Sequence, residues 1–281
     1  MGPLSGNCKR RARGVGNFTH NGARLNFFQV MTEAKQLSQV FDNLLQPARF
    51  KDYGPNGLQV QGREQIHTLV SGVTASKALI EAAIDLKADG IFVHHGLFWR
   101  GQDGCVVGWM RDRLKLLLAH DINLWAYHLP LDAHPEWGNN AQLAKVLGFE
   151  TTGRFGEQDL GLMGYPGEGT FVNAQSLADH VAQRLGRSVT CIDPTGQEIR
   201  RVAWCTGGAQ GYFESAIAAG VDAFLTGEIS EPQMHYEREM GVAFLACGHH
   251  ATERYGAPAV AGHVAQSLGL AHHFVDIDNP A

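Results

Sequence analysis

Two adjacent histidines, His94 and His95, end an apolar run in the segment GIFVHHGLF. Consecutive side chains of a regular strand point to opposite faces, so the two imidazoles can converge only where the strand ends and the backbone turns. Gly96 follows directly, and we expect it to permit that turn. The pair is therefore a candidate functional site if other polar side chains converge on it.

Two further segments carry ligand-type side chains just after apolar runs. In HLPLDAHPEWGNN, Asp132 follows a strand expected over 122–127, and the prolines deny the loop regular structure. In GHHATER, His249 and Glu253 are four residues apart, so a helix would stack them on one face. His250 would be rotated by about 100° and would miss that face.

These side chains together favour a metal site over separate structural roles. Taken singly, each has an ordinary explanation: a hydrogen-bonded buried histidine, a turn-capping aspartate, or a glutamate on a solvated helix face. Gathered in one buried place they would be costly, and a first-row divalent cation with nitrogen and oxygen ligands removes that cost. The number of ligands exceeds the roughly three that one catalytic zinc takes from protein, so the site could hold either two ions bridged by a carboxylate or a single ion. The candidate ligands are His94, His95, Asp132, His249 and Glu253.

The elements that would position these ligands alternate between strand-like and helical patterns. Strand, helix and strand are expected over 68–73, 76–88 and 90–95, and again over 201–206, 210–219 and 222–226. Repeated alternation of this kind indicates an α/β fold with largely parallel sheets. A glycine-rich stretch from about residue 150 marks a boundary between the two runs.

The two runs also resemble each other. Residues 81–95 align without a gap on residues 214–228, and Asp89 then corresponds to Asp222. We interpret this as a duplicated βαβ unit, with chance similarity of two amphipathic units as the alternative. Under duplication the histidine pair corresponds to the dipeptide 227–228, Gly-Glu. Both positions are carboxyl ends of strands, where α/β folds bind ligands.

The composition is that of a globular protein of 281 residues, 44% hydrophobic and 18% charged. Residues 1–30 hold five basic and no acidic residues, so the remainder carries a net charge of −10. This acidic body argues against nucleic-acid binding, and we expect the basic arm to be a disordered extension. No apolar stretch reaches the roughly 20 residues that span a bilayer. Five spaced cysteines without a CxxC pair argue against disulfides and a thiolate zinc site, so we expect a cytoplasmic protein.

Five motifs, in this order and spacing, resemble those of the Nif-three-like dinuclear metal-centre family, also named GTP cyclohydrolase I type 2 homologues. They are GPNGLQVQG (54–62), GIFVHHGLFWRG (90–101), HLPLDAHPEWGNN (128–140), TGEISE (226–231) and GHHATER (248–254). The resemblance covers residues 32–281 and implies that the five candidate ligands hold two divalent ions, whether zinc, manganese, iron or magnesium.

The resemblance also implies an architecture. We expect two interleaved, similar α/β domains with mixed, largely parallel sheets and the metal site between them. Residues 31–135 with 230–281 would form the domain that carries the ligands, and residues 136–229 would form the second. The family's assembly is a toroidal homo-hexamer, a trimer of dimers, with no role known for residues 1–30.

Three functions are compatible with such a site. The first is a hydrolase of the GTP cyclohydrolase type 2 kind, in which metal-bound hydroxide attacks a small-molecule or nucleotide-like substrate. Glu228 or His235 would then relay the proton, and His128 or His134 would orient ligands. No glycine-rich phosphate loop is visible, so the substrate stays open. The alternatives are a non-enzymatic metal-binding ring that acts as a scaffold, regulator or sensor, and a metal-dependent oxidase linked to DNA repair.

Overall fold

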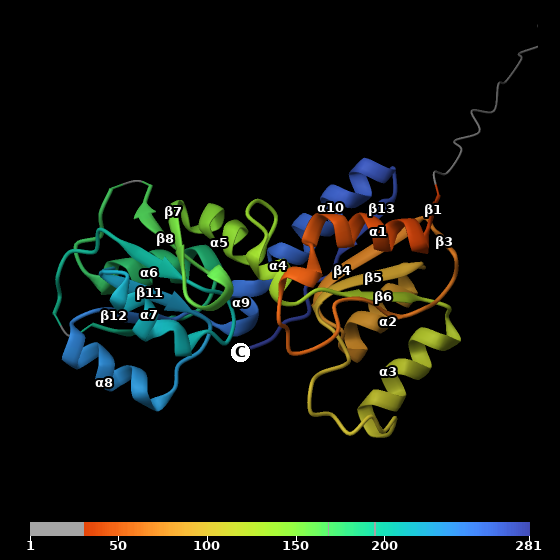
Figure 1. Cartoon of the computed structure of the whole chain (residues 1–281), viewed down its shortest axis with the longest axis horizontal. Helices are drawn as coiled ribbons and strands as arrows, with labels where there is room; N and C mark the ends of the chain where they lie inside the picture. Colours follow the sequence, from red (N-terminus) through yellow and green to blue (C-terminus); the bar gives the residue numbers. More distant parts are fainter. Residues whose placement is uncertain (1–30, 168, 194) are drawn as a thin grey trace, which may run out of the picture.

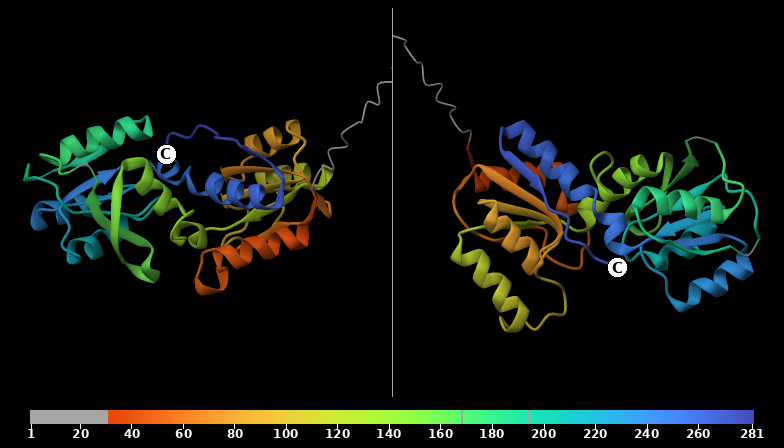
Figure 2. Two further views of the ribbon diagram at one scale, coloured as in Figure 1. Left: turned by 90° about the horizontal axis from the view of Figure 1, so that it is seen from above. Right: turned by 180° about the vertical axis from the view of Figure 1, so that it is seen from behind.

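A computed structural model describes residues 31–281 except Glu168 and Pro194. The expectation for the basic arm, residues 1–30, lies outside the described residues. Figure 1 shows two α/β lobes side by side, with the C-terminus between them. Views from above and from behind keep the same arrangement, with the C-terminal segment, drawn in blue, running between the lobes (Figure 2). Within the described part, no helix has both the length and the apolar character needed to cross a membrane.

The first lobe is built on a five-stranded sheet. Its strands run in the order β13 (Ala271–Phe274), β4 (Thr68–Thr74), β5 (Gly90–His95), β6 (Asn123–Ala126) and β2 (Gly57–Val60), all parallel except β2. One face packs on α1 (Ala34–Leu45) and α10 (Gly256–Leu268), the other on α2 (Lys77–Asp85) and α3 (Gly108–Ala119). Because both faces are covered, β5 is apolar almost throughout: Phe92 points to one face, and Ile91 and Val93 to the other.

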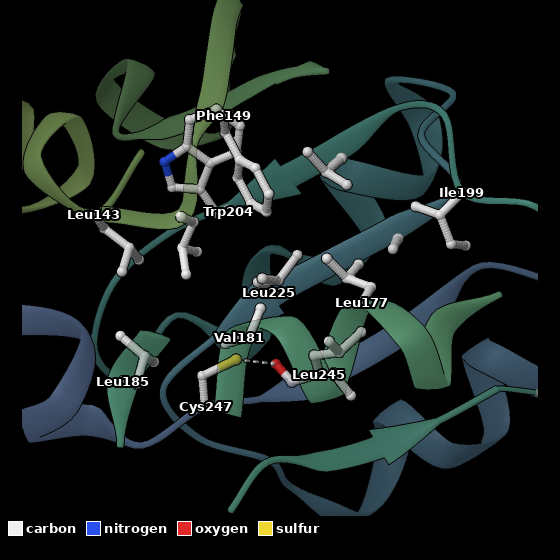
Figure 3. Close-up of a cluster of buried hydrophobic side chains, with 14 of the residues drawn as sticks. Leu143, Phe149, Leu177, Val181, Leu185, Ile199, Trp204, Leu225, Leu245 and Cys247 are labelled. Atoms are coloured by element: carbon white, nitrogen blue, oxygen red, sulfur yellow. Dashed lines mark hydrogen bonds between the residues drawn. The ribbon is translucent and has the colours of Figure 1, made fainter. Parts of the chain in front are cut away.

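The second lobe is built on a six-stranded mixed sheet. Its order is β7 (Phe149–Phe155), β8 (Gly161–Pro166), β10 (Val202–Trp204), β11 (Ala223–Thr226), β12 (Ala243–Ala246) and β9 (Thr190–Ile192). Strands β10, β11 and β12 are parallel, and the others pair antiparallel. Helices α5 (Asn139–Leu147) and α6 (Ala174–Leu185) cover one face, and α7 (Phe213–Ala218) and α8 (Glu231–Met240) the other. Figure 3 shows the core under α6, where Trp204, Leu225 and Leu245 of the sheet lie near Leu177 and Val181.

Short elements complete the described part. They are β1 (Thr32–Glu33) paired with β3 (Gln65–Ile66), the 3-10 turns η1 (Pro47–Arg49), η2 (Glu157–Asp159) and η3 (Gln210–Tyr212), and the helices α4 (Leu129–Ala133) and α9 (His249–Glu253). Helices α4 and α9 follow β6 and β12, the third parallel strand of each lobe along the chain. The expected irregular loop around Asp132 was wrong, because Pro130 lies in the first turn of α4, where a helix tolerates proline. A break at residues 254–255 separates α9 from α10.

The expected interleaving of two α/β domains is confirmed, but one boundary differs. After α4 the chain passes into the second lobe through α5, and after α9 it returns through α10 and β13. We expected the chain to return to the first lobe at residue 230. Strand β12 instead lies between β11 and β9 in the six-stranded sheet, because its apolar residues complete the second core.

The expected internal duplication is visible in the hydrogen bonds at the start of each parallel sheet. Asp89 Oδ2 accepts the backbone N–H groups of residues 67 and 68 at 2.8 and 3.0 Å. Asp222 Oδ2 accepts those of residues 200 and 201, the aligned positions, at 2.8 and 2.7 Å. A carboxylate at the strand start thus anchors the preceding strand in both lobes. The alignment therefore reflects a shared structural unit.

Candidate metal centre

The structure brings all five expected ligands together where the two lobes meet. His94 Nε2 lies 3.5 Å from Asp132 Oδ1 and 3.4 Å from Glu253 Oε1. His95 Nε2 and His249 Nε2 lie 3.2 and 3.1 Å from Glu253 Oε2. The His249–Glu253 contact is the expected pairing across one turn of α9. These side chains come from the end of β5, from α4 and from α9, so residues far apart in the sequence share one cluster.

The two histidines of β5 converge because Glu253 lies beyond the end of the strand. Each ring approaches a different oxygen of that carboxylate. Gly96 plays another part than expected, because it is not among the residues with positive φ. A Cβ at Gly96 would collide with the carboxamide of Gln59, whose Oε1 accepts the backbone N–H of Leu97 at 2.8 Å. The glycine thus lets the GPNGLQVQG segment pack against the strand end.

The hydrogen bonds of His94 fix where its proton lies. Nδ1 is 3.1 Å from the carbonyl oxygen of Tyr127, which can only accept, so Nδ1 carries the proton. In the neutral ring the lone pair of Nε2 then faces the carboxylates of Asp132 and Glu253. His94 Nε2 and Glu253 Oε2 are buried and have no hydrogen-bond partner among the described residues. Opposed lone pairs of this kind need a shared positive charge, and the nitrogen and oxygen donors fit a divalent cation.

The pKa values show how strongly the cluster attracts positive charge. Burial disfavours a charged His94, but Asp132 and Glu253 outweigh it and raise its pKa to about 9. Burial likewise opposes protonation of His249, whereas Glu253 and Glu228 raise its pKa to about 9. Burial, with repulsion from the other imidazoles, lowers the pKa of His95 to about 3. His95 is therefore neutral at pH 7, the state in which imidazole binds a metal.

The carboxylates respond in opposite directions. Burial alone would raise the pKa of Glu253, but the surrounding imidazoles, His94 foremost, hold it well below its usual value. Burial dominates for Asp132 and raises its pKa, despite the proximity of His94. Glu253 is thus the carboxylate at the electrostatic centre of the cluster.

A second layer of polar groups orients the ligands. Asp132 Oδ1 accepts from Asn139 Nδ2 at 2.9 Å and from Thr206 Oγ1 at 3.2 Å. His249 Nδ1 lies 2.6 Å from Glu228 Oε1, and His95 Nδ1 lies 3.1 Å from Thr74 Oγ1. Contacts of this kind, like that of His94 Nδ1 with the Tyr127 carbonyl oxygen, set ring orientation and tautomer in metal sites.

His128 is closer to the cluster than its expected orienting role implied. One ligand atom each from His94, His95 and His128 lie within 4.8 Å of one another. His128 Nδ1 contacts Asp52 Oδ1 at 2.7 Å. Burial alone would raise the pKa of Asp52, but His128, together with hydrogen bonds from Asn56 and the backbone of Tyr53, lowers it. The available sequence signal was that His128 follows an apolar strand, as His94 and His95 do.

Sequence reasoning missed the glycine pair after β10. Gly207 has φ +71°, and a Cβ there would collide with the Glu253 carboxylate. Its backbone N–H donates to Thr252 Oγ1 at 3.0 Å. The Gly-Gly dipeptide at a strand end was the signal that could have found it.

Two of the side chains suggested for catalysis or orientation do not reach the cluster. His235 is exposed on α8 and pairs with Glu231 at 2.8 Å. His134 Nδ1 accepts the backbone N–H groups of Glu136 and Trp137, which is a turn-stabilising role. His250, expected to miss the cluster, contacts Asp276 at 2.8 Å. Glu228 remains the candidate for proton transfer that the structure places beside a ligand.

A hollow of about 190 Å³ opens onto the cluster. His95 and His249 lie in its wall, and their side chains are 18% and 27% exposed. The remaining lining residues are Val73, Thr74, His250, Asn279 and Ala281. A small group from solvent can therefore approach these two imidazoles, whereas His94 is fully enclosed.

Known proteins resemble this chain over nearly all of its described length. The model of the Duf34/NIF3 (NGG1p interacting factor 3) family matches residues 32–280. A Pseudomonas aeruginosa protein named GTP cyclohydrolase 1 type 2 homolog is 53% identical to this chain, and the alignment covers 85% of this chain and 95% of that protein. A protein of the same name from Neisseria meningitidis serogroup A is 54% identical, and the alignment covers 84% of this chain and 94% of that protein. A solved structure described as "protein ybgI, unknown function" is 47% identical, with a TM-score of 0.85 over 89% of this chain and 100% of that one. The chain therefore belongs to the Duf34/NIF3 family, whose similar members include proteins named GTP cyclohydrolase 1 type 2 homolog.

Proposed function

We propose that this protein is a metal-dependent hydrolase of nucleotide-like small molecules, with its five clustered side chains holding two divalent cations. The observation that carries the proposal is the buried Nε2 of His94, which faces two carboxylates without a hydrogen-bond partner in the described residues. Zinc, manganese, iron and magnesium all accept ligands of this set, with imidazole favouring the first-row transition metals.

The grouping of the ligands supports two ions. One group consists of His94, Asp132 and Glu253, and another of His95, His249 and Glu253. Glu253 belongs to both and offers Oε1 toward His94 and Oε2 toward the other two imidazoles. Each group holds about the number of protein ligands found in catalytic zinc sites, which keep a position open for water or substrate. Glu253 would therefore help to hold both cations.

The protein's own residues supply the rest of the chemistry. Divalent ions at such a site lower the pKa of a bound water and so provide a nucleophile at neutral pH. Glu228 holds His249 through Nδ1, and its side chain is 45% exposed beside the hollow. Its second oxygen, Oε2, accepts from Gln210 at 3.3 Å and is the atom at which we place proton uptake.

The hollow limits what enters the site. A volume of about 190 Å³ is below the roughly 300–1,000 Å³ of pockets that enclose a whole drug-sized ligand. It therefore admits the reacting group of a nucleotide, with the remainder outside. The names of the similar proteins make GTP the first substrate to test.

The test combines metal analysis with turnover. Protein purified without chelator is analysed for its elements, then assayed on nucleoside triphosphates with added manganese, zinc, iron or magnesium. We expect turnover by the wild type and by His235→Ala, which lies away from the cluster, and none by His95→Ala. Metal bound without turnover above the His95→Ala background would overturn the hydrolase and favour a scaffold or sensor. Oxygen-dependent turnover with iron would instead favour an oxidase.

Assembly is a separate proposal. The family resemblance implies a toroidal hexamer, a trimer of dimers, and we propose that arrangement for this chain. Light scattering coupled to size exclusion should give six times the mass of the 30.6 kDa chain. A monomer or dimer at micromolar concentration would contradict it.

A further inference from the structure

A second, larger hollow lies on the opposite side of α4 from the metal cluster. Its volume is about 490 Å³, and residues of both lobes line it. They include Leu44 of α1 and Arg49 of η1, Ala133 of α4 and His134 of the following turn, and Arg154 of β7 and Asp159 of η2. Along a helix, residues 130, 133 and 134 share one face, whereas residue 132 points away from it. Asp132 thus reaches the cluster, while its neighbours face this hollow.

Two arginines in the hollow have only neutral partners. Arg49 Nη1 donates to Gln46 Oε1 at 3.0 Å. Arg154 donates to the carbonyl oxygens of Ala133 and Asp159 at 3.3 and 3.1 Å. In residues 31–167, 169–193 and 195–281, no carboxylate lies within 4.0 Å of either guanidinium group. Neither guanidinium group is therefore in an ion pair, although Asp159 also lines the hollow and the net charge from residue 31 onward is −10.

His134 adds a neutral donor to the same wall. Its Nδ1 accepts backbone N–H groups of the turn that follows α4, so the ring proton is on Nε2. An N–H group beside two guanidinium groups complements a phosphate, because phosphate oxygens accept several charge-assisted hydrogen bonds at once.

The backbone around the hollow is unusual. Five non-glycine residues of the described part have positive φ, and three of them, Gln46, Gln158 and Asp159, lie on this hollow. Gln158 is held in place by its carboxamide, which contacts the backbone N–H and carbonyl of Lys51 at 2.8 and 3.2 Å. Such conformations persist where the surrounding structure enforces them, and they concentrate at binding sites.

We propose that this hollow binds the phosphate group of a small phosphorylated metabolite, through Arg49, Arg154 and His134. Its volume falls within the range of small-molecule pockets, so the remainder of such a ligand fits between the lobes. The site is separate from the metal cluster and does not depend on the proposed hydrolase activity.

The experiment measures binding to the metal-free full-length chain, so that anions cannot bind to the cations. Inorganic phosphate, pyrophosphate and ribose 5-phosphate are titrated by calorimetry. We expect one site, with affinity reduced about tenfold or more in Arg49→Gln and in Arg154→Gln. Arg111→Gln, on the exposed surface of α3, and His95→Ala should bind as the wild type does.

Several results would overturn the proposal. One is binding that is unchanged in both arginine variants; another is the absence of binding by all three probes. Binding that is lost in His95→Ala would place the anion at the metal cluster instead. Dependence on both arginines seen only with a single-stranded RNA oligonucleotide would assign the surface to a macromolecule. Arg49→Gln removes only a contact to Gln46, so a folding defect in Arg154→Gln would not obscure the result.

Discussion

The ends of the parallel strands differ between the two lobes, although the strands themselves correspond. Strand β5 ends in His94 and His95, while the aligned positions after β11 are Gly227 and Glu228. In the first lobe the strand end supplies two imidazoles to the cluster. In the second, Gly227 allows close packing, because a Cβ there would collide with the backbone of His249, and Glu228 holds the His249 ring.

The preceding strands show the same contrast. Thr74, at the end of β4, has space for a side chain whose hydroxyl contacts His95. The aligned residue after β10 is Gly207, where a Cβ would collide with Glu253. One copy of the unit thus provides ligands, and the other provides space and orientation. The cluster is therefore asymmetric although the scaffold is duplicated.

Loss of the shared carboxylate should have the largest effect. Glu253→Ala leaves three imidazoles without the group they all face, so metal affinity should fall about 100- to 1,000-fold. That range follows from dividing the about 10–16 kcal/mol of structural zinc binding among four ligands. Competition with a metal indicator would measure it, with Glu231→Ala on exposed α8 as the control. Unchanged metal affinity would show that Glu253 is not a metal ligand shared by the three imidazoles.

Gly207→Ala should have the second-largest effect, because the added methyl group fills the space that the second copy of the unit keeps open beside Glu253. The new Cβ meets the Glu253 carboxylate, and φ is +71°, so we expect a loss of stability of about 1–3 kcal/mol together with weaker metal binding. Urea unfolding and metal titration measure the two effects. The aligned substitution, Thr74→Ala, should be milder in both. Equal effects would contradict the proposed asymmetry.

Glu228→Gln tests the orienting role of the second copy. The amide still accepts a hydrogen bond from His249 but carries no charge, so metal affinity should fall by about 10- to 100-fold, as for other groups behind metal ligands. Metal titration of the purified variant measures this directly. An effect as large as that of Glu253→Ala would mean that Glu228 is itself a ligand.

The smallest effects should come from the two anchoring aspartates, where the copies are alike. Asp89→Asn and Asp222→Asn each weaken two backbone hydrogen bonds and should cost about 1–2 kcal/mol of unfolding free energy. Asp89→Asn should cost more, because Asp89 also pairs with Arg63 at 2.9 Å. Denaturant unfolding measures both. A change in metal affinity in either variant would show that the anchors are not purely structural.

Much of the fold could be predicted because local patterns report local structure. The apolar runs of β4, β5 and β11 and the shared aspartates identified two α/β units. The prediction that the chain returns to the first lobe at residue 230 was wrong, because nothing in the local sequence of β12 shows which of the two sheets the strand joins. The break between α9 and α10 lies inside a continuous helical pattern, so the sequence gives no local sign of it either.

The types of ligand side chain, and the strand ends that carry them, could be identified from the amino-acid sequence, because polar residues directly after apolar runs are easy to recognise. The three-dimensional packing was needed to show that His128 lies in the cluster, that His235 does not, and that Gly207 must lack a side chain. These facts depend on distances between segments of different lobes. Such distances follow from how two sheets pack together, which no single stretch of residues encodes.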